Sequence, residues 1–195
     1  MPRNKVQFGF SNAYFAPLSV QETGGVETIT YETPIKLGPG KSHKADPKAE
    51  SEDYYADDEI LDTFSTMDGY DIEVSITEVT EEFKTKILGD QLDKNGMLLE
   101  NPKGTSKPFA FLCQYDGDAK ARRHVFYYCT AERPGMEAAT SEGKIDPKEQ
   151  TVKIVAKKAP GIGRIKASTS EEKVKPETYN KFFESVTMPG ELAEG

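Results

Sequence analysis

The sequence predicts a mainly β protein: a β-sandwich or β-barrel with one or two short peripheral α-helices. Many short segments rich in Val, Ile, Phe and Tyr are separated by turn signals, and only two stretches follow the helical period. At 195 residues, the chain is close to the usual size of one domain and is long enough to bury a core. We therefore expect a single β domain over residues 1–188 and a flexible C-terminal tail over 189–195.

The N-terminal part predicts a hairpin followed by a long loop. Residues 5–16 and 26–32 are strand-like and are separated by the turn signal Gly24-Gly25. Residues 38–53 contain almost no side chain that could be buried, so this segment cannot offset the entropy of its own ordering. Because loops of this length are uncommon in compact domains, we expect a long mobile loop over about 38–53 that a partner orders.

A strand and a short helix are predicted next. After the turn signal Asp68-Gly69, apolar and polar residues alternate over 72–77, which is the pattern of a strand with one exposed face. Thr80 can serve as the N-cap of a helix that Gly89 ends. Three apolar side chains of this helix are expected to pack on a sheet: Phe83, Ile87 and Leu88.

The C-terminal half contains the strongest strand signals. Residues 109–115 and 122–133 are rich in Phe, Tyr and Val, residues 151–156 alternate, and a further strand is expected through Ile165. Pro176 opens a second helix candidate that extends to residue 186. Cys113 and Cys129 lie too far apart along the predicted ladder to be bridged, so we expect two free, buried thiols.

Charge and composition exclude several classes of function. Lys plus Arg is 25 and Asp plus Glu is 33, and the net charge of −8 opposes sequence-independent adhesion to nucleic acid. No run of about 18 apolar residues is present, and no apolar signal core follows the N-terminus, so we expect synthesis in the cytoplasm and no membrane contact. We assign no catalytic residue, metal ligand or cofactor.

One motif suggests an enzyme. Tyr55-Ala56-Asp57-Asp58 resembles the metal-binding turn of reverse transcriptases, in which two carboxylates hold Mg²⁺ for phosphoryl transfer. That chemistry needs the carboxylates on a tight turn between apolar strands, whereas here a solvated acidic run precedes them. A nucleic-acid enzyme using this motif is the main alternative from another class of function.

The same region is a candidate subunit interface. Eight acidic residues and one lysine occupy positions 46–62, which most often indicates a solvated surface. Tyrosine is favoured at interfaces, so the segment can instead pair with basic residues of a neighbouring subunit. The candidate interface residues are Tyr54, Tyr55, Asp57 and Asp58.

Five blocks of the sequence occur in a specific order and spacing: NKVQFGF (4–10), YYADD (54–58), FKTKILG (83–89), NG (95–96) and RHVFYYCTAERP (123–134). In this arrangement the chain resembles the major tail protein, or tail tube protein, family of long-tailed siphovirus phages of Gram-positive bacteria. The resemblance extends from about residue 4 to residue 186, and the segments 38–53 and 188–195 fall outside it.

The resemblance implies a structural virion protein and no enzyme. Its fold would be of the phage tail-tube type, and its partners would be further copies of itself in hexameric rings that stack into a tube. The tape-measure protein, the tail terminator or tail-tip proteins and non-specifically conducted phage DNA would also contact it. A further hypothesis is that the protein is a monomeric β-sandwich binding module. Such a module needs exposed aromatic clusters, and the absence of Trp weakens this hypothesis.

Overall fold

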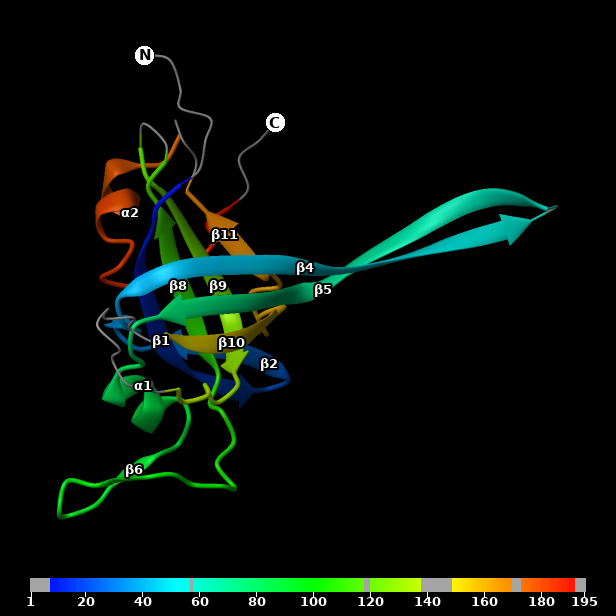
Figure 1. The fold of residues 1–195 in the computed structure, drawn as a ribbon. Coiled ribbons are helices and arrows are strands. Elements are labelled where there is room, and N and C mark those ends of the chain that lie inside the picture. Colours follow the sequence, from blue (N-terminus) through cyan, green and yellow to red (C-terminus); the bar gives the residue numbers. More distant parts are fainter. Residues whose placement is uncertain (1–7, 57, 118–119, 138–148, 170–172, 192–195) are drawn as a thin grey trace, which may run out of the picture.

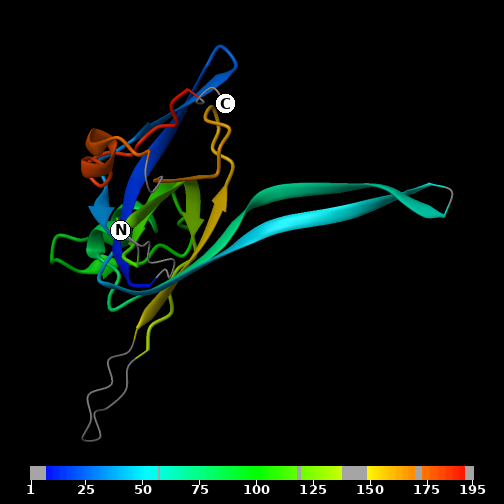
Figure 2. The ribbon, with the colours of Figure 1, turned by 90° about the horizontal axis from the view of Figure 1, so that it is seen from above.

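The computed structural model of the chain describes residues 8–56, 58–117, 120–137, 149–169 and 173–191 (Figures 1 and 2). It is mainly β, with 53% strand and 7% helix, as the sequence predicts. The strands are β1 (Phe10–Thr23), β2 (Val26–Tyr31), β3 (Ile35–Lys36), β4 (Gly40–Ala56), β5 (Glu59–Ile76), β6 (Gln91–Leu92), β7 (Leu98–Leu99), β8 (Phe109–Tyr115), β9 (Arg122–Ala131), β10 (Gln150–Lys157) and β11 (Lys166–Ser168). The helices are α1 (Glu81–Lys86) and α2 (Pro176–Asn180).

Nearly all strands belong to one antiparallel sheet with the order β2-β1-β8-β9-β10-β5-β4. β3 pairs with β1, β11 pairs with β9, and β6 and β7 form a separate two-stranded ladder. The sheet bends over itself, so that β10, β5 and β4 cross in front of β1, β8 and β9 (Figure 1). The main core lies between these two halves.

β8 and β9 are buried on both faces, which explains their continuous apolar sequence. Along β8, Phe109 and Phe111 point into the main core, whereas Ala110 and Leu112 point into a second cluster on the opposite face. The strands that cross β8 contribute the other wall of the main core: Ile72, Val74, Ile76, Val152 and Ile154. This is the alternation expected for residues 72–77 and 151–156.

Helix α1 packs on the sheet as predicted. Phe83, Ile87 and Leu88 are buried in the main core, and Phe83 meets Phe15 and Phe109 in edge-to-face contacts. Thr80 occupies the N-cap position, but its side chain makes no capping hydrogen bond and donates instead to the carbonyl oxygen of Lys36 at 3.2 Å.

Helix α2 is shorter than predicted, because the regular helix ends at Asn180 and turns follow it. Phe182 is nevertheless buried in the second cluster, with Phe183 and Val186 packed beside it. The guanidinium carbon of Arg123 lies 3.8 Å from the ring centroid of Tyr179, so a stacked cation holds this segment against β9. The C-terminal segment is therefore positioned by apolar contacts and not by a continuous helix.

The prediction of two free, buried thiols is confirmed. Cys113 pairs with His124 and Cys129 pairs with Phe109, with a register shift in the β8–β9 ladder between Phe109 and Phe111. Both thiols are free and buried, and burial raises the pKa of each.

The expected loop over 38–53 is wrong in its secondary structure. Residues 40–56 form β4, which pairs with β5 along almost its whole length. The sequence shows no strand pattern here, because among the described side chains of β4 only those of His43 and Ala45 are partly buried, and backbone hydrogen bonds to β5 form the strand. Pro47, which cannot donate to a ladder, is accommodated because β4 is the last strand of the sheet. Asp68-Gly69 is likewise part of β5 and not a turn.

Candidate assembly surface

β4 and β5 extend far beyond the body of the protein as a two-stranded arm (Figures 1 and 2). The pairing of β10 with β5 ends where Lys157 meets Gly69, so the rest of β5 has only β4 beside it. We call residues 49–67 the distal arm. Each of its side chains that the structure describes is exposed, and its outer strand edges have no partner among the described residues.

The base of the arm is shaped by a bulge and a glycine. Lys48 pairs with Gly69 and Ala49 pairs with Met67, so Asp68 is an extra residue in β5. A β-carbon placed on Gly69 would lie 2.1 Å from the carbonyl oxygen of Ala156. Only glycine allows β10 to approach β5 this closely, and the arm diverges from the body at this position.

His43 anchors β4 to the body just before the arm begins. Its ring stacks on Phe10 and Phe111 with centroid distances of 5.3 and 5.6 Å. The Tyr115 hydroxyl is hydrogen-bonded to His43 Nδ1. This contact ties the start of β4 to β8, on the other half of the folded sheet.

Burial makes this histidine a poor base. Burial, with the nearby positive charge of Lys166, lowers the pKa of His43 to about 4. The same two causes, together with His43 and Arg122, lower the pKa of His124 to about 4. Both rings are therefore neutral at pH 7 and act as aromatic packing groups.

The distal arm carries apolar side chains on both of its faces. Residues that pair across an antiparallel ladder share a face, and alternate residues along a strand share a face. Tyr54 and Phe64 therefore lie on one face, because their partners are Asp62 and Glu52. Met67 and Ile60 lie on the other face, as the partners of Ala49 and Tyr55.

This exposure is large. Tyr54, Tyr55 and Phe64 are 56%, 62% and 58% exposed, and Leu61, the extra residue of a second bulge, is 69% exposed. A two-stranded hairpin by itself is marginally stable in water, and large exposed apolar clusters usually mark an interaction surface. The distal arm has the composition of a segment that another surface covers on both faces.

The distal arm is also strongly acidic. Its sequence contains seven carboxylates and no basic residue: Glu50, Glu52, Asp53, Asp57, Asp58, Glu59 and Asp62. Asp53 accepts a hydrogen bond from the Thr63 hydroxyl at 2.7 Å, and Asp62 accepts one from the Thr63 backbone N–H at 2.8 Å. The six of these carboxylates that the structure describes form no ion pair with a described lysine or arginine.

Three of the four predicted interface residues lie at the tip of the arm. Tyr54 and Tyr55 are exposed there, and Asp58 occupies the turn with a left-handed φ of 61°. Asp57 lies outside the described residues. Four apolar residues of β5 belong to the same surface but were not among the predicted interface residues: Ile60, Leu61, Phe64 and Met67. Bulges and intervening acidic residues interrupt the spacing of these apolar side chains, so it follows neither the helical nor the strand period.

The enzyme motif therefore lies at the end of an exposed hairpin. Tyr55 pairs with Ile60 and Ala56 pairs with Glu59, and both strands that lead to the turn are open to solvent. Within the described ranges, no group of three His, Cys, Asp or Glu side chains is arranged to hold a metal ion.

A second projection leaves the body at β6 and β7, below α1 (Figure 1). We call residues 91–107 the β6–β7 projection. Asp93 closes its turn, because its carboxylate accepts the backbone N–H groups of Asn95 and Met97 at 2.8 and 2.7 Å. These hydrogen bonds lower the pKa of Asp93. Three large apolar residues of the projection are exposed: Leu92, Met97 and Leu99.

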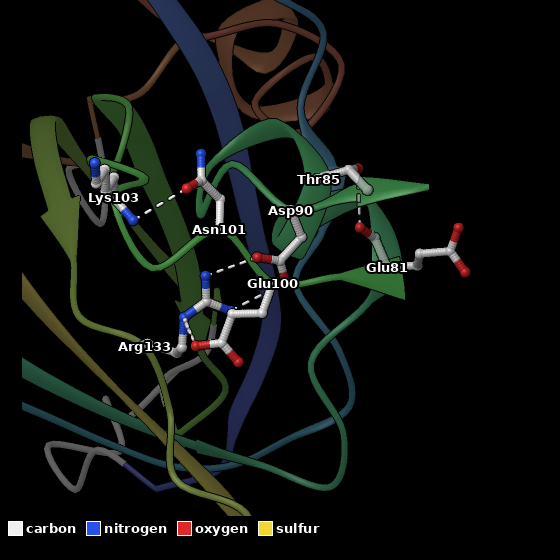
Figure 3. Close-up of polar contacts among 7 residues, drawn as sticks. All are labelled: Glu81, Thr85, Asp90, Glu100, Asn101, Lys103 and Arg133. Carbon is white, nitrogen blue, oxygen red and sulfur yellow. Dashed lines mark hydrogen bonds and ion pairs between the residues drawn. The ribbon is translucent and has the colours of Figure 1, made fainter. Parts of the chain in front are cut away.

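Arg133 ties this projection to the body (Figure 3). Its Nη2 and Nη1 donate to Oδ1 and Oδ2 of Asp90 at 2.6 and 3.0 Å, and its Nε lies 3.0 Å from Glu100 Oε1. The Asp90 side chain is 4% exposed, so its carboxylate is largely shielded from water, whereas the Arg133 side chain is 32% exposed. The sequence gives no local signal for this contact, because 43 residues separate its two partners.

No protein-family model matches the chain, and no curated protein matches it. Over the described part of the chain, none of the helices is long and apolar enough to cross a membrane.

Proposed function

We propose that this protein is the major tail tube subunit of a non-contractile phage tail, which self-assembles into stacked hexameric rings around a DNA-conducting channel. Three features support the proposal: the resemblance of the ordered sequence blocks, the mainly β fold and the projecting arm. The observation that carries it is the distal arm, because its exposed apolar residues lie on both faces and its strand edges are open.

The arm explains why assembly would stabilise this chain. A free arm exposes apolar side chains and unpaired backbone groups to water. Contact with neighbouring copies buries the side chains, and a ring or tube repeats the same contact many times. The net charge of −8 per subunit also disfavours tight phosphate contacts, which would let DNA move through a channel without being held.

Electron microscopy tests the proposal directly. Purified protein at increasing concentration and several ionic strengths is expected to form rings or tubes in negative stain, with matching large species in sedimentation velocity. A species that stays monomeric under all of these conditions would contradict the proposal. Because tube growth can require an initiator, the concentrated samples are decisive.

An arm-deletion variant is the matched control. Every described side chain that is removed when a short Asn-Gly turn replaces residues 49–67 is exposed, so the body is expected to keep its core and its thermal unfolding transition. Rings and tubes should be lost. Equal assembly with and without the distal arm would show that the interface lies elsewhere.

The enzyme alternative is tested separately. Polymerase or nuclease activity with Mg²⁺ or Mn²⁺ that disappears in the Asp57→Ala and Asp58→Ala variants would replace the structural role by a catalytic one. The tail-tube proposal predicts no such activity and predicts that the Asp58→Ala variant still assembles.

A further inference from the structure

We infer that the distal arm of one copy docks on the β6–β7 projection of another copy of this chain. This inference rests on the proposed function and adds to it the surface that receives the arm. Two independent properties support this pairing of surfaces. Both parts of the protein expose apolar side chains, and their unpaired charges have opposite sign.

The first property is the distribution of exposed apolar side chains. The distal arm holds the largest group, and the β6–β7 projection holds the next: Leu92, Met97 and Leu99 are 55%, 61% and 49% exposed. The tip of the β1–β2 hairpin adds only Val20 and Val26, at 39% and 64%, with Glu22 and Glu27 beside them. Among described segments, the projection is therefore the best apolar counterpart for the arm.

The second property is charge. The acids of the segment around the projection already have partners, because Asp90 and Glu100 bind Arg133 and Asp93 binds backbone N–H groups. Its exposed lysines do not: among the described residues, Lys94, Lys103 and Lys107 form no ion pair. The projection thus presents unpaired positive charge beside exposed apolar side chains.

The distal arm presents the complementary surface, with unpaired carboxylates among its apolar residues. Opposite charges that approach at an interface rim guide association and set the register, while the apolar side chains provide most of the buried area. A second copy is the partner that carries both required properties.

The two surfaces cannot meet within one chain. The arm and the β6–β7 projection leave the body in different directions, the arm to the right and the projection at the lower left (Figure 1). The contact must then join different copies. It is heterologous, because each copy offers its arm to one neighbour and its projection to another, and such contacts close into rings or continue as filaments.

Cross-linking tests which surfaces meet. The native thiols are buried, so a cysteine introduced at an exposed position is the reactive one. Phe64→Cys protein mixed with Leu99→Cys protein and a short thiol-to-thiol cross-linker should give a covalent dimer. A chain carrying both substitutions should give a ladder. Phe64→Cys protein mixed with Val20→Cys protein is the control, since Val20 is exposed on the β1–β2 hairpin.

The yield of cross-linked dimer from the Phe64→Cys and Leu99→Cys mixture should be several-fold higher than the yield from the Phe64→Cys and Val20→Cys control. Equal yields would overturn the docking inference. If tubes are seen by electron microscopy while this pair shows no preference, the tail-tube proposal stands and the assigned docking surface is wrong. If neither tubes nor cross-links form, both are wrong.

Charge reversal provides a second test. Glu52→Lys with Asp62→Lys, or Lys94→Glu with Lys103→Glu, should each raise the critical concentration for assembly about tenfold, because each pair of substitutions replaces attraction between exposed charges by repulsion. Combining all four substitutions restores opposite charges and should bring assembly back toward that of the native protein. Two exposed lysines of the C-terminal segment, changed as Lys175→Glu with Lys181→Glu, are the control and should have little effect.

The combined variant decides this test. A critical concentration as high as the product of the two separate effects would show that the reversed charges do not face each other. Restoration would assign the acids of the distal arm to the lysines of the projection.

Discussion

Gly69 of β5 lies directly against Ala156 of β10, where a β-carbon on the glycine would be 2.1 Å from the alanine carbonyl oxygen. This contact is the last one between the arm-bearing strand and the body, because the β5–β10 ladder ends at the pair of Gly69 with Lys157. The position where the arm leaves the sheet therefore depends on one residue without a side chain.

Substituting Gly69 by alanine should destabilise the protein. The added methyl group cannot fit unless the backbone of β10 moves, and overpacking of this kind costs about 1–3 kcal/mol. Chemical denaturation with urea would measure the loss. Gly135→Ala is the control, since a β-carbon at Gly135 meets nothing within 4 Å. Equal stability of the two variants would show that β10 yields without cost.

Removing Arg133 should have a larger effect than removing an exposed cation. In the Arg133→Met variant the Asp90 carboxylate stays buried without its partner, and loss of a buried pair's partner costs about 3–5 kcal/mol. The Lys86→Met variant breaks only the exposed pair with Glu32 and should cost less than about 1 kcal/mol. Urea titrations would measure the loss of unfolding free energy in each of these two variants.

A double variant separates charge from packing in this contact. If the uncompensated Asp90 carboxylate causes the loss, Arg133→Met combined with Asp90→Asn should recover part of the stability. A double variant that is less stable than Arg133→Met alone would contradict the electrostatic explanation.

Stability should fall as the pH is lowered from about 6.5 toward 4. The pKa values of His43 and His124 are lowered to about 4 in the folded protein, against 6.5 for an ordinary histidine. Between these values the unfolded chain binds more protons than the folded one, so stability increases with pH across this window. The contribution is complete above about pH 6.5.

Thermal unfolding at a series of pH values measures this dependence. In the His43→Phe variant, an aromatic ring still stacks on Phe10 and Phe111, but one proton-binding group is removed. The slope of Tm against pH between 4 and 6.5 should therefore be shallower than in the native protein. An unchanged slope would show that His43 does not contribute.

Amide hydrogen exchange should divide β5 into two parts. Residues 69–76 lie between β4 and β10 with buried side chains, whereas the distal arm has only one neighbouring strand at each position. In the monomer the distal arm should exchange much faster than residues 69–76. On assembly it should become protected, and equal exchange in both states would place the interface away from the arm.

The order of residues alone predicts the parts of the fold in which buried side chains recur with a regular period. The strands at 109–115, 122–131 and 150–157 and the packing of Phe83, Ile87 and Leu88 were predictable, because apolar side chains there follow the period of a strand or a short helix. Tyr54 and Tyr55 were singled out from residue type alone and are exposed in the structure, whereas their role in a subunit interface stays a prediction and Asp57 is outside the described residues.

The remaining features of the fold depend on contacts between residues that are far apart in the chain. β4 has no buried face along its outer half, so its strand conformation comes from backbone hydrogen bonds to β5 that leave no apolar pattern in the sequence. The placement of β10 between β9 and β5, the contact of Arg133 with Asp90 and the stacking around His43 all join residues far apart in the chain. Local propensity cannot encode such contacts, because they exist only once the sheet has folded over its core.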